Sequence, residues 1–88
     1  MNSIILSYDL RAPGRNYDAL YEKIKAFPKW AKITESTWLL KTNKTCVQVR
    51  DEIASVVDSN DRIFVTKSTG EAAWRNVICN SDYLKENL

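Results

Sequence analysis

The sequence contains no histidine, only two cysteines and no long apolar run, and each absence excludes a class of function. Without histidine there is no Ser-His-Asp or Cys-His catalysis, no histidine metal site and no histidine pH switch. Cys46 and Cys79 form no close pair, which excludes a zinc ribbon. We expect two reduced, packed thiols, with a single disulfide as the alternative. Any chemistry must therefore rest on carboxylates, hydroxyls, amines or a metal held by oxygen ligands.

The 88 residues, of which 44% are hydrophobic and 27% charged, are typical of one small globular domain that spans residues 1–88. No apolar stretch approaches the roughly 20 residues that cross a bilayer. Residues 1–3 lack the basic start of a secretory signal. We therefore expect a cytoplasmic protein with no membrane partner and no small-molecule cofactor.

The net charge of +2 is too small to indicate a nucleic-acid partner by itself, but the charges are unevenly distributed. Residues 1–50 hold nine Lys and Arg against four Asp and Glu, whereas residues 51–88 hold four against seven. The N-terminal half could therefore present a basic face. Solvated lysines on helix exteriors are the alternative interpretation.

Apolar spacing predicts the first strand and the first helix. Residues 4–8 form a short branched and aromatic run that is typical of a buried strand, and residues 9–14 break it with adjacent proline and glycine. Asn16 is a suitable N-cap for a helix that Pro28 ends. The apolar residues of this helix recur at helical spacing: Tyr17, Leu20, Ile24 and Phe27.

Alternation along the first strand assigns its side chains to two faces, one with Ile4, Leu6 and Tyr8 and the other with Ile5, Ser7 and Asp9. Because the first set is more apolar, we expect it to face the helices. Asp9 would then stand on the open face of the sheet, at the C-terminal end of the strand.

The middle of the chain predicts two more strands, a second helix and a fourth strand. The strands span residues 30–33 and 37–42, and a capping box of Thr45 and Gln48 begins the helix. Residues 58–61 form a turn cluster before a strand at residues 63–66. The resulting βαββαβ order predicts an α+β fold, a ferredoxin-like sandwich with both helices on one face of an antiparallel sheet.

Residues 70–88 form a C-terminal extension beyond what this fold needs. They are too apolar for a loose tail, with Ala72, Ala73, Trp74, Val77 and Ile78. We expect an extra strand, a short helix or both, covering the open face or pairing along a sheet edge, in the same subunit or across a dimer. The helix would span residues 82–87 behind Asn80 or Ser81, with Tyr83 and Leu84 facing inward.

Several separated stretches in the same order carry a resemblance to a known family: residues 7–10 (SYDL), 13–14 (PG), 35–40 (ESTWLL), 49–51 (VRD), 58–61 (DSND), 70–74 (GEAAW) and 83–88 (YLKENL). Over nearly its full length the chain resembles small uncharacterised bacterial and phage proteins labelled the SinR family. That family is similar to the Cas-two group of CRISPR-associated proteins and to its toxin relative VapD. The shared features are a strand that ends in Tyr-Asp and a later segment matched by residues 36–38. The resemblance implies a ferredoxin-like homodimer that associates with nucleic acid.

The resemblance also implies one site. Asp9 matches the strand-end aspartate that the Cas-two group places near the dimer axis, where two carboxylates can share an Mg²⁺ ion. Ser7, Arg11 and Arg15 would assist, the arginines as phosphate contacts. The alternative interpretation is an aspartate that caps a turn.

Three functions follow, of which a non-catalytic binding or scaffold module is favoured. The others are a Mg²⁺-dependent endonuclease centred on Asp9 and a protein-interaction module of a toxin–antitoxin or phage system.

Further residues are candidates for binding. Lys41, Lys44 and Arg50 could line a basic groove, or be ordinary exposed charges. Each tryptophan could stack on bases or anchor the core or an interface, and the predicted dimer contacts are Trp38, Trp74, Val77 and Ile78. Asp58, Asn60 and Asp61 resemble part of a calcium loop but lack its length and final glutamate, so we expect a turn.

Overall fold

The structure, a computed structural model, describes all residues 1–88 and has four strands and three helices. They are β1 (Asn2–Asp9), α1 (Asp18–Lys25), β2 (Lys29–Thr34), β3 (Thr37–Thr42), α2 (Cys46–Ala54), β4 (Arg62–Lys67) and α3 (Ser81–Asn87). The predicted α+β class is confirmed. The strands begin or end at most two residues from their predicted bounds.

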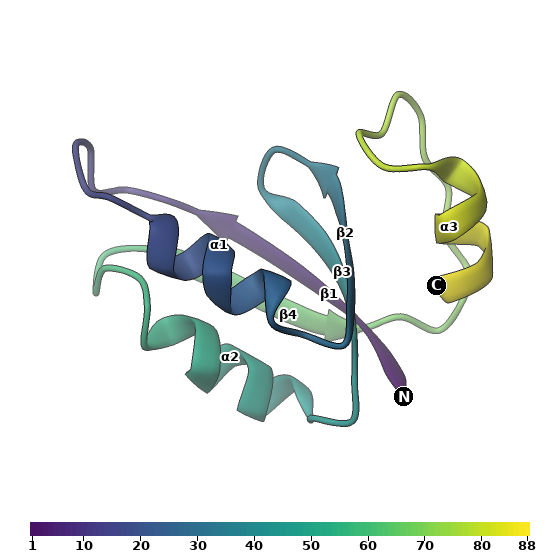
Figure 1. The fold of residues 1–88 in the computed structure, drawn as a ribbon, viewed down its shortest axis with the longest axis horizontal. Coiled ribbons are helices and arrows are strands. Elements are labelled where there is room, and N and C mark those ends of the chain that lie inside the picture. The colour runs from purple at the N-terminus through teal and green to yellow at the C-terminus, as the bar shows by residue number, and fades with distance from the viewer.

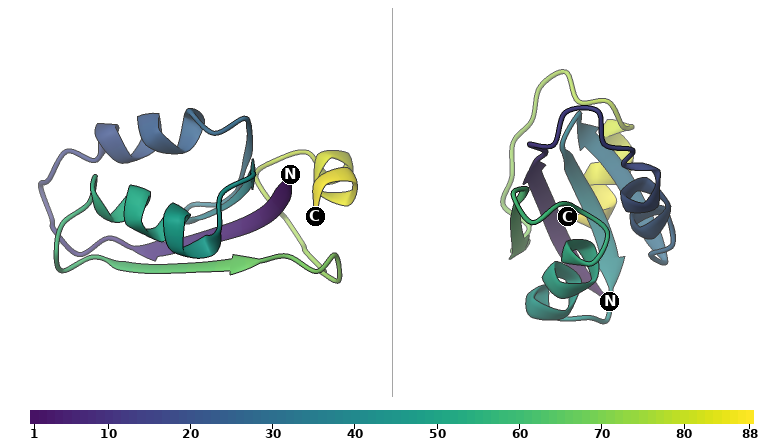
Figure 2. Two further views of the ribbon diagram at one scale, coloured as in Figure 1. Left: turned by 90° about the horizontal axis from the view of Figure 1, so that it is seen from below. Right: turned by 90° about the vertical axis from the view of Figure 1, so that its left-hand side faces the viewer.

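The four strands form one antiparallel sheet in the order β2-β3-β1-β4. β1 lies in the interior, where Ile5 is opposite Leu39 of β3 on one side and Thr66 of β4 on the other. β2 and β4 are the edge strands. Helices α1 and α2 lie together over one face of this sheet (Figure 2).

The main core fills the space between the sheet and these two helices. Its buried residues are Ile4, Leu6, Tyr8, Leu20, Ile24, Phe27, Trp38, Leu40, Val49 and Ile53. The predicted alternation of β1 is confirmed, because Ile4, Leu6 and Tyr8 face the helices. Helix α2 begins as predicted, since Gln48 N donates to Thr45 Oγ1 at 3.2 Å and Thr45 N donates to Gln48 Oε1 at 2.8 Å.

The start of α1 differs from the prediction by one residue. The N-cap is Tyr17, not Asn16, and its side chain makes no capping hydrogen bond. Asn16 Oδ1 still accepts a hydrogen bond from Asp18 N at 2.8 Å. Asn16 therefore forms a local turn of the kind that asparagine favours, and the helix begins two residues later, at Asp18.

Residues 68–88 cover part of the other face of the sheet with a short helix and no extra strand. Leu84 of α3 packs on Ala31 and Leu39, and residues around them complete a second core: Ile5, Ile33, Trp74, Val77, Cys79, Tyr83 and Leu88. Asn80 caps α3, and Ile78 N donates to Ile33 O of β2 at 2.9 Å. Figure 1 shows α3 on the opposite side of the β2–β3 hairpin from α1 and α2. The extension therefore closes its own subunit.

The two cysteines belong to different cores. Cys46 packs against the main core and Cys79 against the second core, and both thiols are free. A disulfide needs Cα atoms within about 7 Å of each other. Because the sheet lies between the two cores, the expected reduced thiols fit this arrangement and the alternative disulfide does not.

Replacing Leu84 by alanine tests the second core. The side chain is 1% exposed, so the substitution should lower the free energy of unfolding by about 2–5 kcal/mol. Urea unfolding followed by circular dichroism measures this loss. Lys85→Ala, at an exposed neighbouring position, is the matched control and should change it by less than about 0.5 kcal/mol. Equal stability of both variants would show that residues 68–88 do not pack on the sheet.

Candidate functional site

Asp9 lies at the end of β1, on the part of the second face that residues 68–88 leave open. Its side chain is 58% exposed and accepts a hydrogen bond from Nη1 of Arg62, its partner across the β1–β4 pair, at 3.2 Å. A shallow hollow of about 180 Å³ surrounds the pair and is lined by Ser7, Tyr8, Asp9, Arg62, Ile63 and Phe64. Ser7 therefore lies near Asp9 as the resemblance implies, whereas the role of Arg62 was missed. Only the antiparallel register of two strands separated by 52 residues brings Arg62 to Asp9.

The surroundings of Asp9 do not fit a metal site within one subunit. The structure has no group of three His, Cys, Asp or Glu residues that could hold a metal ion. Asp9 supplies one carboxylate, and the guanidinium of Arg62 already binds it. Mg²⁺ prefers octahedral oxygen ligands, and an adjacent cation repels it. Asp9 and Arg62 therefore form an ion pair, not a metal site, within one subunit.

Asp61 is the centre of a hydrogen-bond cluster that joins the loop before α1 to the turn before β4. Its carboxylate accepts from Arg11 N at 2.6 Å, from Tyr17 Oη at 2.9 Å and from Asp58 N at 2.8 Å. Burial raises the pKa of Asp61, but these hydrogen bonds outweigh that effect and hold the pKa below its ordinary value. The predicted turn at residues 58–61 is confirmed, and its aspartates serve the fold.

The basic residues predicted to bind nucleic acid do not form one groove. Arg15 pairs with Asp58 at 3.4 Å near the C-terminal end of β1, and the exposed Arg11 follows the same end. Lys41 lies opposite Ser3 at the other end of β1, and its Nζ donates to Ser3 Oγ at 2.8 Å. Lys44 pairs with Glu52 at 2.6 Å. Three of these four cations therefore have partners within the chain.

Arg50 also has a partner, because its Nη2 lies 2.9 Å from the carboxylate of its neighbour Asp51. Both side chains are more than half exposed. Arg50 is therefore an ordinary surface charge, and it lies on α2 rather than in a groove with Lys41.

The predicted interface residues have different surroundings. Trp38 is 2% exposed in the main core, where its indole N–H donates to Tyr8 Oη at 2.9 Å. Its ring therefore belongs to the core of its own subunit and not to an exposed face, which corrects the expectation of a dimer contact. Trp74 and Val77 are half-buried against the second core, whereas Ile78 is 55% exposed.

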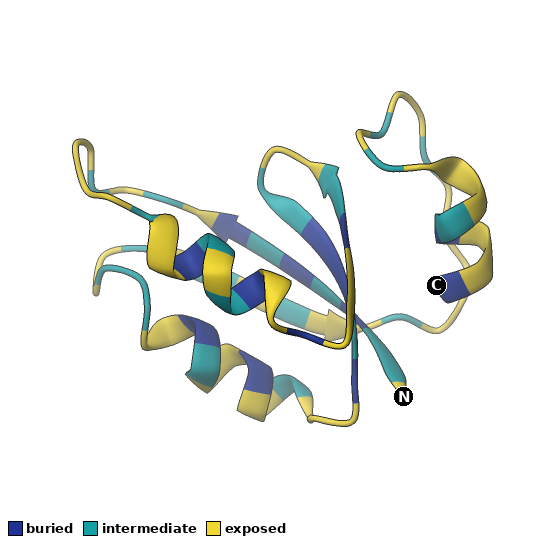
Figure 3. Cartoon of the chain, viewed as in Figure 1, coloured by how far each residue is buried: buried dark blue, intermediate teal, exposed yellow.

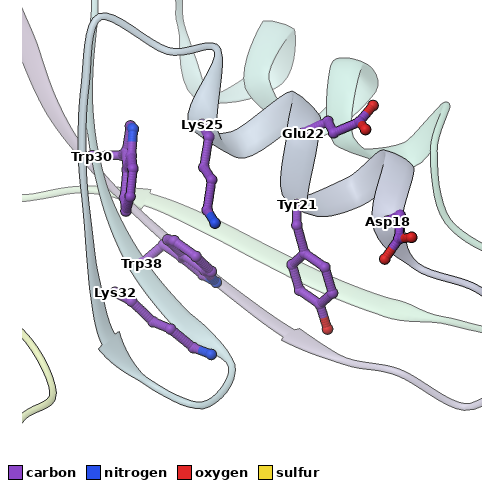
Figure 4. Close-up of a pocket in the computed structure, with 7 residues that line it drawn as sticks. All are labelled: Asp18, Tyr21, Glu22, Lys25, Trp30, Lys32 and Trp38. Atoms are coloured by element: carbon purple, nitrogen blue, oxygen red, sulfur yellow. The ribbon is translucent and has the colours of Figure 1, made fainter.

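A larger hollow that the sequence did not predict lies between α1 and the β2–β3 hairpin. It has a volume of about 490 Å³ and is lined by Asp18, Tyr21, Glu22, Lys25, Trp30, Lys32 and Trp38. We call it the aromatic–lysine pocket (Figure 4). The rings of Trp30 and Trp38 have centroids 5.8 Å apart and are tilted by 57°. Lys25 Nζ lies 5.5 Å from the Trp30 ring, and Lys32 Nζ lies 5.6 Å from the Trp38 ring.

Several polar groups of this pocket have no partner in the protein. The indole N–H of Trp30 and the hydroxyl of Tyr21 make no hydrogen bond, whereas those of Trp38, Trp74 and Tyr17 do. Lys25 has no carboxylate within 4.0 Å, and Lys32 has only Glu35 at 3.5 Å, itself 90% exposed. These groups are therefore free to bind a ligand. Base stacking by a tryptophan is one interpretation of the sequence, and Trp30, at 39% exposure, is the only exposed tryptophan among those that line a pocket.

No protein-family model matches the chain, and no solved structure matches it. No helix combines the length and the apolar character that crossing a membrane requires.

The pKa of Asp61 leads to a pH-dependent prediction. Because this pKa is lowered in the folded state, the carboxylate stabilises the fold above the ordinary aspartate pKa of about 4, and this contribution is lost as the pH falls through the lower folded value. At neutral pH, Asp61→Asn should therefore be less stable than the wild type. On acidification it should lose less of its free energy of unfolding than the wild type does. Urea midpoints at pH 7 and pH 3 measure both effects.

The matched control for this prediction is Asp51→Asn, because Asp51 is exposed and pairs only with its neighbour Arg50. The urea midpoint of Asp51→Asn should change with pH as that of the wild type does. If Asp61→Asn keeps the full acid sensitivity of the wild type, the cluster does not depend on the charge of Asp61.

Proposed function

We propose that this protein is a Cas-two-like homodimer that associates with nucleic acid as a binding or scaffold module and not as a nuclease. We also propose that its topology is the ferredoxin-like split βαβ. The strand order β2-β3-β1-β4 and the two helices on one face support that topology. The position of Asp9 at the end of an interior strand supports the resemblance to the Cas-two group.

The observation that carries the choice of a binding module is the ion pair of Asp9 with Arg62. A nuclease of the alternative type needs an Asp9 carboxylate that is available to a divalent cation, as part of a larger oxygen ligand set. Here the nearest charged group is a guanidinium, whose Nη1 lies 3.2 Å from Asp9 Oδ2. Arg62 neutralises the charge that would attract the metal. The endonuclease would require a second Asp9 from a partner subunit and displacement of both arginines.

Support for a nucleic-acid partner comes from lysines that follow one another from the end of α1 into β2. Lys25 and Lys29 are exposed and have no carboxylate within 4.0 Å. Lys32 has one partner, Glu35, which is itself 90% exposed. Unpaired cations at one edge of a sheet can contact phosphates, which contribute most of the sequence-independent affinity for nucleic acid. They lie in the basic half of the chain, but they are not the residues that the sequence singled out.

Support for a homodimer comes from the open part of the second face. Phe64 is 65% exposed there, beside Asp9 and on the edge strand β4. A large exposed aromatic side chain next to an unpaired strand edge is typical of a contact surface. Two copies that meet through this face would bring their Asp9 residues towards each other, as the resemblance implies.

Asp9→Asn separates the binding module from the nuclease. Labelled single-stranded and duplex RNA and DNA are incubated with wild type and variant, with Mg²⁺ or with a chelator. The affinities of the two proteins for each nucleic acid should agree within about twofold, and neither protein should cut any of them. The reason is that an exposed ion pair contributes little to stability and no phosphate contact depends on it. Cleavage that requires Mg²⁺ and is lost in Asp9→Asn would establish the endonuclease. If no nucleic acid binds, the proposal is wrong and a protein-interaction module takes its place.

The homodimer predicts a mass twice that of the monomer in sedimentation at micromolar concentration. Phe64→Thr places a β-branched residue, which strands favour, at this position and removes the aromatic contact, so it should shift the protein to the monomer. Val47→Thr is the control, because Val47 is 57% exposed on α2, away from this face. A monomeric wild type would contradict the dimer and remove the shared Asp9 site.

A further inference from the structure

Trp30 is held as a fixed, half-exposed aromatic surface. It lies on the edge strand β2, and its ring packs against the buried Trp38 at a centroid distance of 5.8 Å. The Nζ atom of Lys25 lies over the Trp30 ring, 5.5 Å from its centroid, in a cation–π contact. The ring therefore needs little ordering before a planar ligand can stack on it.

The charged groups of the aromatic–lysine pocket are separated along its length. Figure 4 shows Lys25 and Lys32 at the tryptophan end, Tyr21 in the middle, and Asp18 at the far end on the first turn of α1. Glu22 points away from the tryptophans in the same view. The pocket thus offers cations beside an aromatic surface, one unpartnered hydroxyl, that of Tyr21, in the middle and a carboxylate acceptor at the other end.

This pattern selects among ligand classes. An apolar ligand would cover the two lysines and Asp18 without satisfying them, which is costly. A simple anion would use the lysines but not the tryptophan. A planar ring that carries an anionic group at one end and N–H or O–H donors at the other satisfies all three parts. A nucleotide has this chemistry, and about 490 Å³ is within the range of small-molecule pockets.

From these observations, and resting on the proposed association with nucleic acid, we infer that the aromatic–lysine pocket binds one unpaired nucleotide. Its base stacks on Trp30, its phosphate contacts Lys25 and Lys32, and a base or sugar donor reaches Asp18. A base within a duplex is stacked on both faces and must be extruded first, at a cost of a few kcal/mol. Single strands are therefore preferred over duplexes at this pocket.

The test uses fluorescence anisotropy with one labelled 12-nucleotide sequence, as single-stranded RNA, as single-stranded DNA and as the DNA duplex. Trp30→Ala should weaken single-strand binding by about 5- to 150-fold, the effect of losing one stacked base, and change duplex binding less than twofold. Trp30→Phe should keep most of the affinity because it keeps an aromatic face. The urea midpoint of each variant checks that it folds.

Lysine variants test the phosphate contact independently of the ring. Lys25→Gln should weaken single-strand binding and reduce the slope of log affinity against log salt by about one. Lys85→Gln is the matched control, since Lys85 is an exposed lysine on α3, on the other side of the sheet. It should leave both affinity and slope unchanged.

The outcomes distinguish this inference from the proposed function. If the wild type binds nucleic acid but Trp30→Ala and Lys25→Gln bind equally well, the pocket inference is overturned and the proposed function stands. If no strand binds but adenosine monophosphate binds in a Trp30-dependent manner, the pocket takes a free nucleotide and the proposed function is wrong. If neither binds, both are wrong. Equal effects of Trp30→Ala on single strands and duplexes would overturn the stacking of an unpaired base.

Discussion

β3 runs through the middle of the protein with Trp38, Leu39 and Leu40 all at 2% exposure or less. This is possible because α1 and α2 cover one face of the sheet while residues 68–88 cover part of the other, including Leu39 (Figure 3). Successive side chains of a strand point to opposite faces, so a single cover would leave Leu39 in water. A small domain has little apolar area to spare, and the second cover adds a core that the βαββαβ elements alone lack.

The limits of the two covers decide which surfaces remain available. Residues 68–88 reach Ile5 and Leu39 but stop before the end of β1, so Asp9 and Phe64 stay exposed. On the helix side, α1 ends before it covers the edge strand, which leaves Trp30 half-exposed above the buried Trp38. The surroundings of Asp9 and of Trp30 are therefore both regions where the elements that pack on the sheet end.

The charges of the protein fall into those that hold the fold together and those that do not. Asp61 joins two loops by accepting hydrogen bonds from Arg11 N and Tyr17 Oη, and Lys41 donates to Ser3 and to the carbonyl of Asn87 near the chain end. Arg62 forms an ion pair with the carboxylate of Asp9. Lys25 and Lys29 have no carboxylate partner in the protein. These lysines near Trp30 are therefore better candidates for ligand contacts than the charges that are already paired.

Local features of the sequence were sufficient to predict the elements. The alternation of residues 4–9, the capping box of Thr45 and Gln48 and the stop at Pro28 act within a few residues, so the strands, the first two helices and the inward face of β1 could be predicted. The surroundings of Asp9 and Trp30 could not. The surroundings of Asp9 depend on the antiparallel register, which brings Arg62 to it from more than 50 positions away in the sequence. The surroundings of Trp30 depend on how α1 packs beside β2 and β3. The sequence by itself determined the order of the elements, because short-range hydrogen bonds and apolar spacing specify them. Only the tertiary structure decided which charges are neutralised and that the ring of Trp30 stays exposed. These features depend on where α1, α2 and residues 68–88 stop covering the two faces of the sheet.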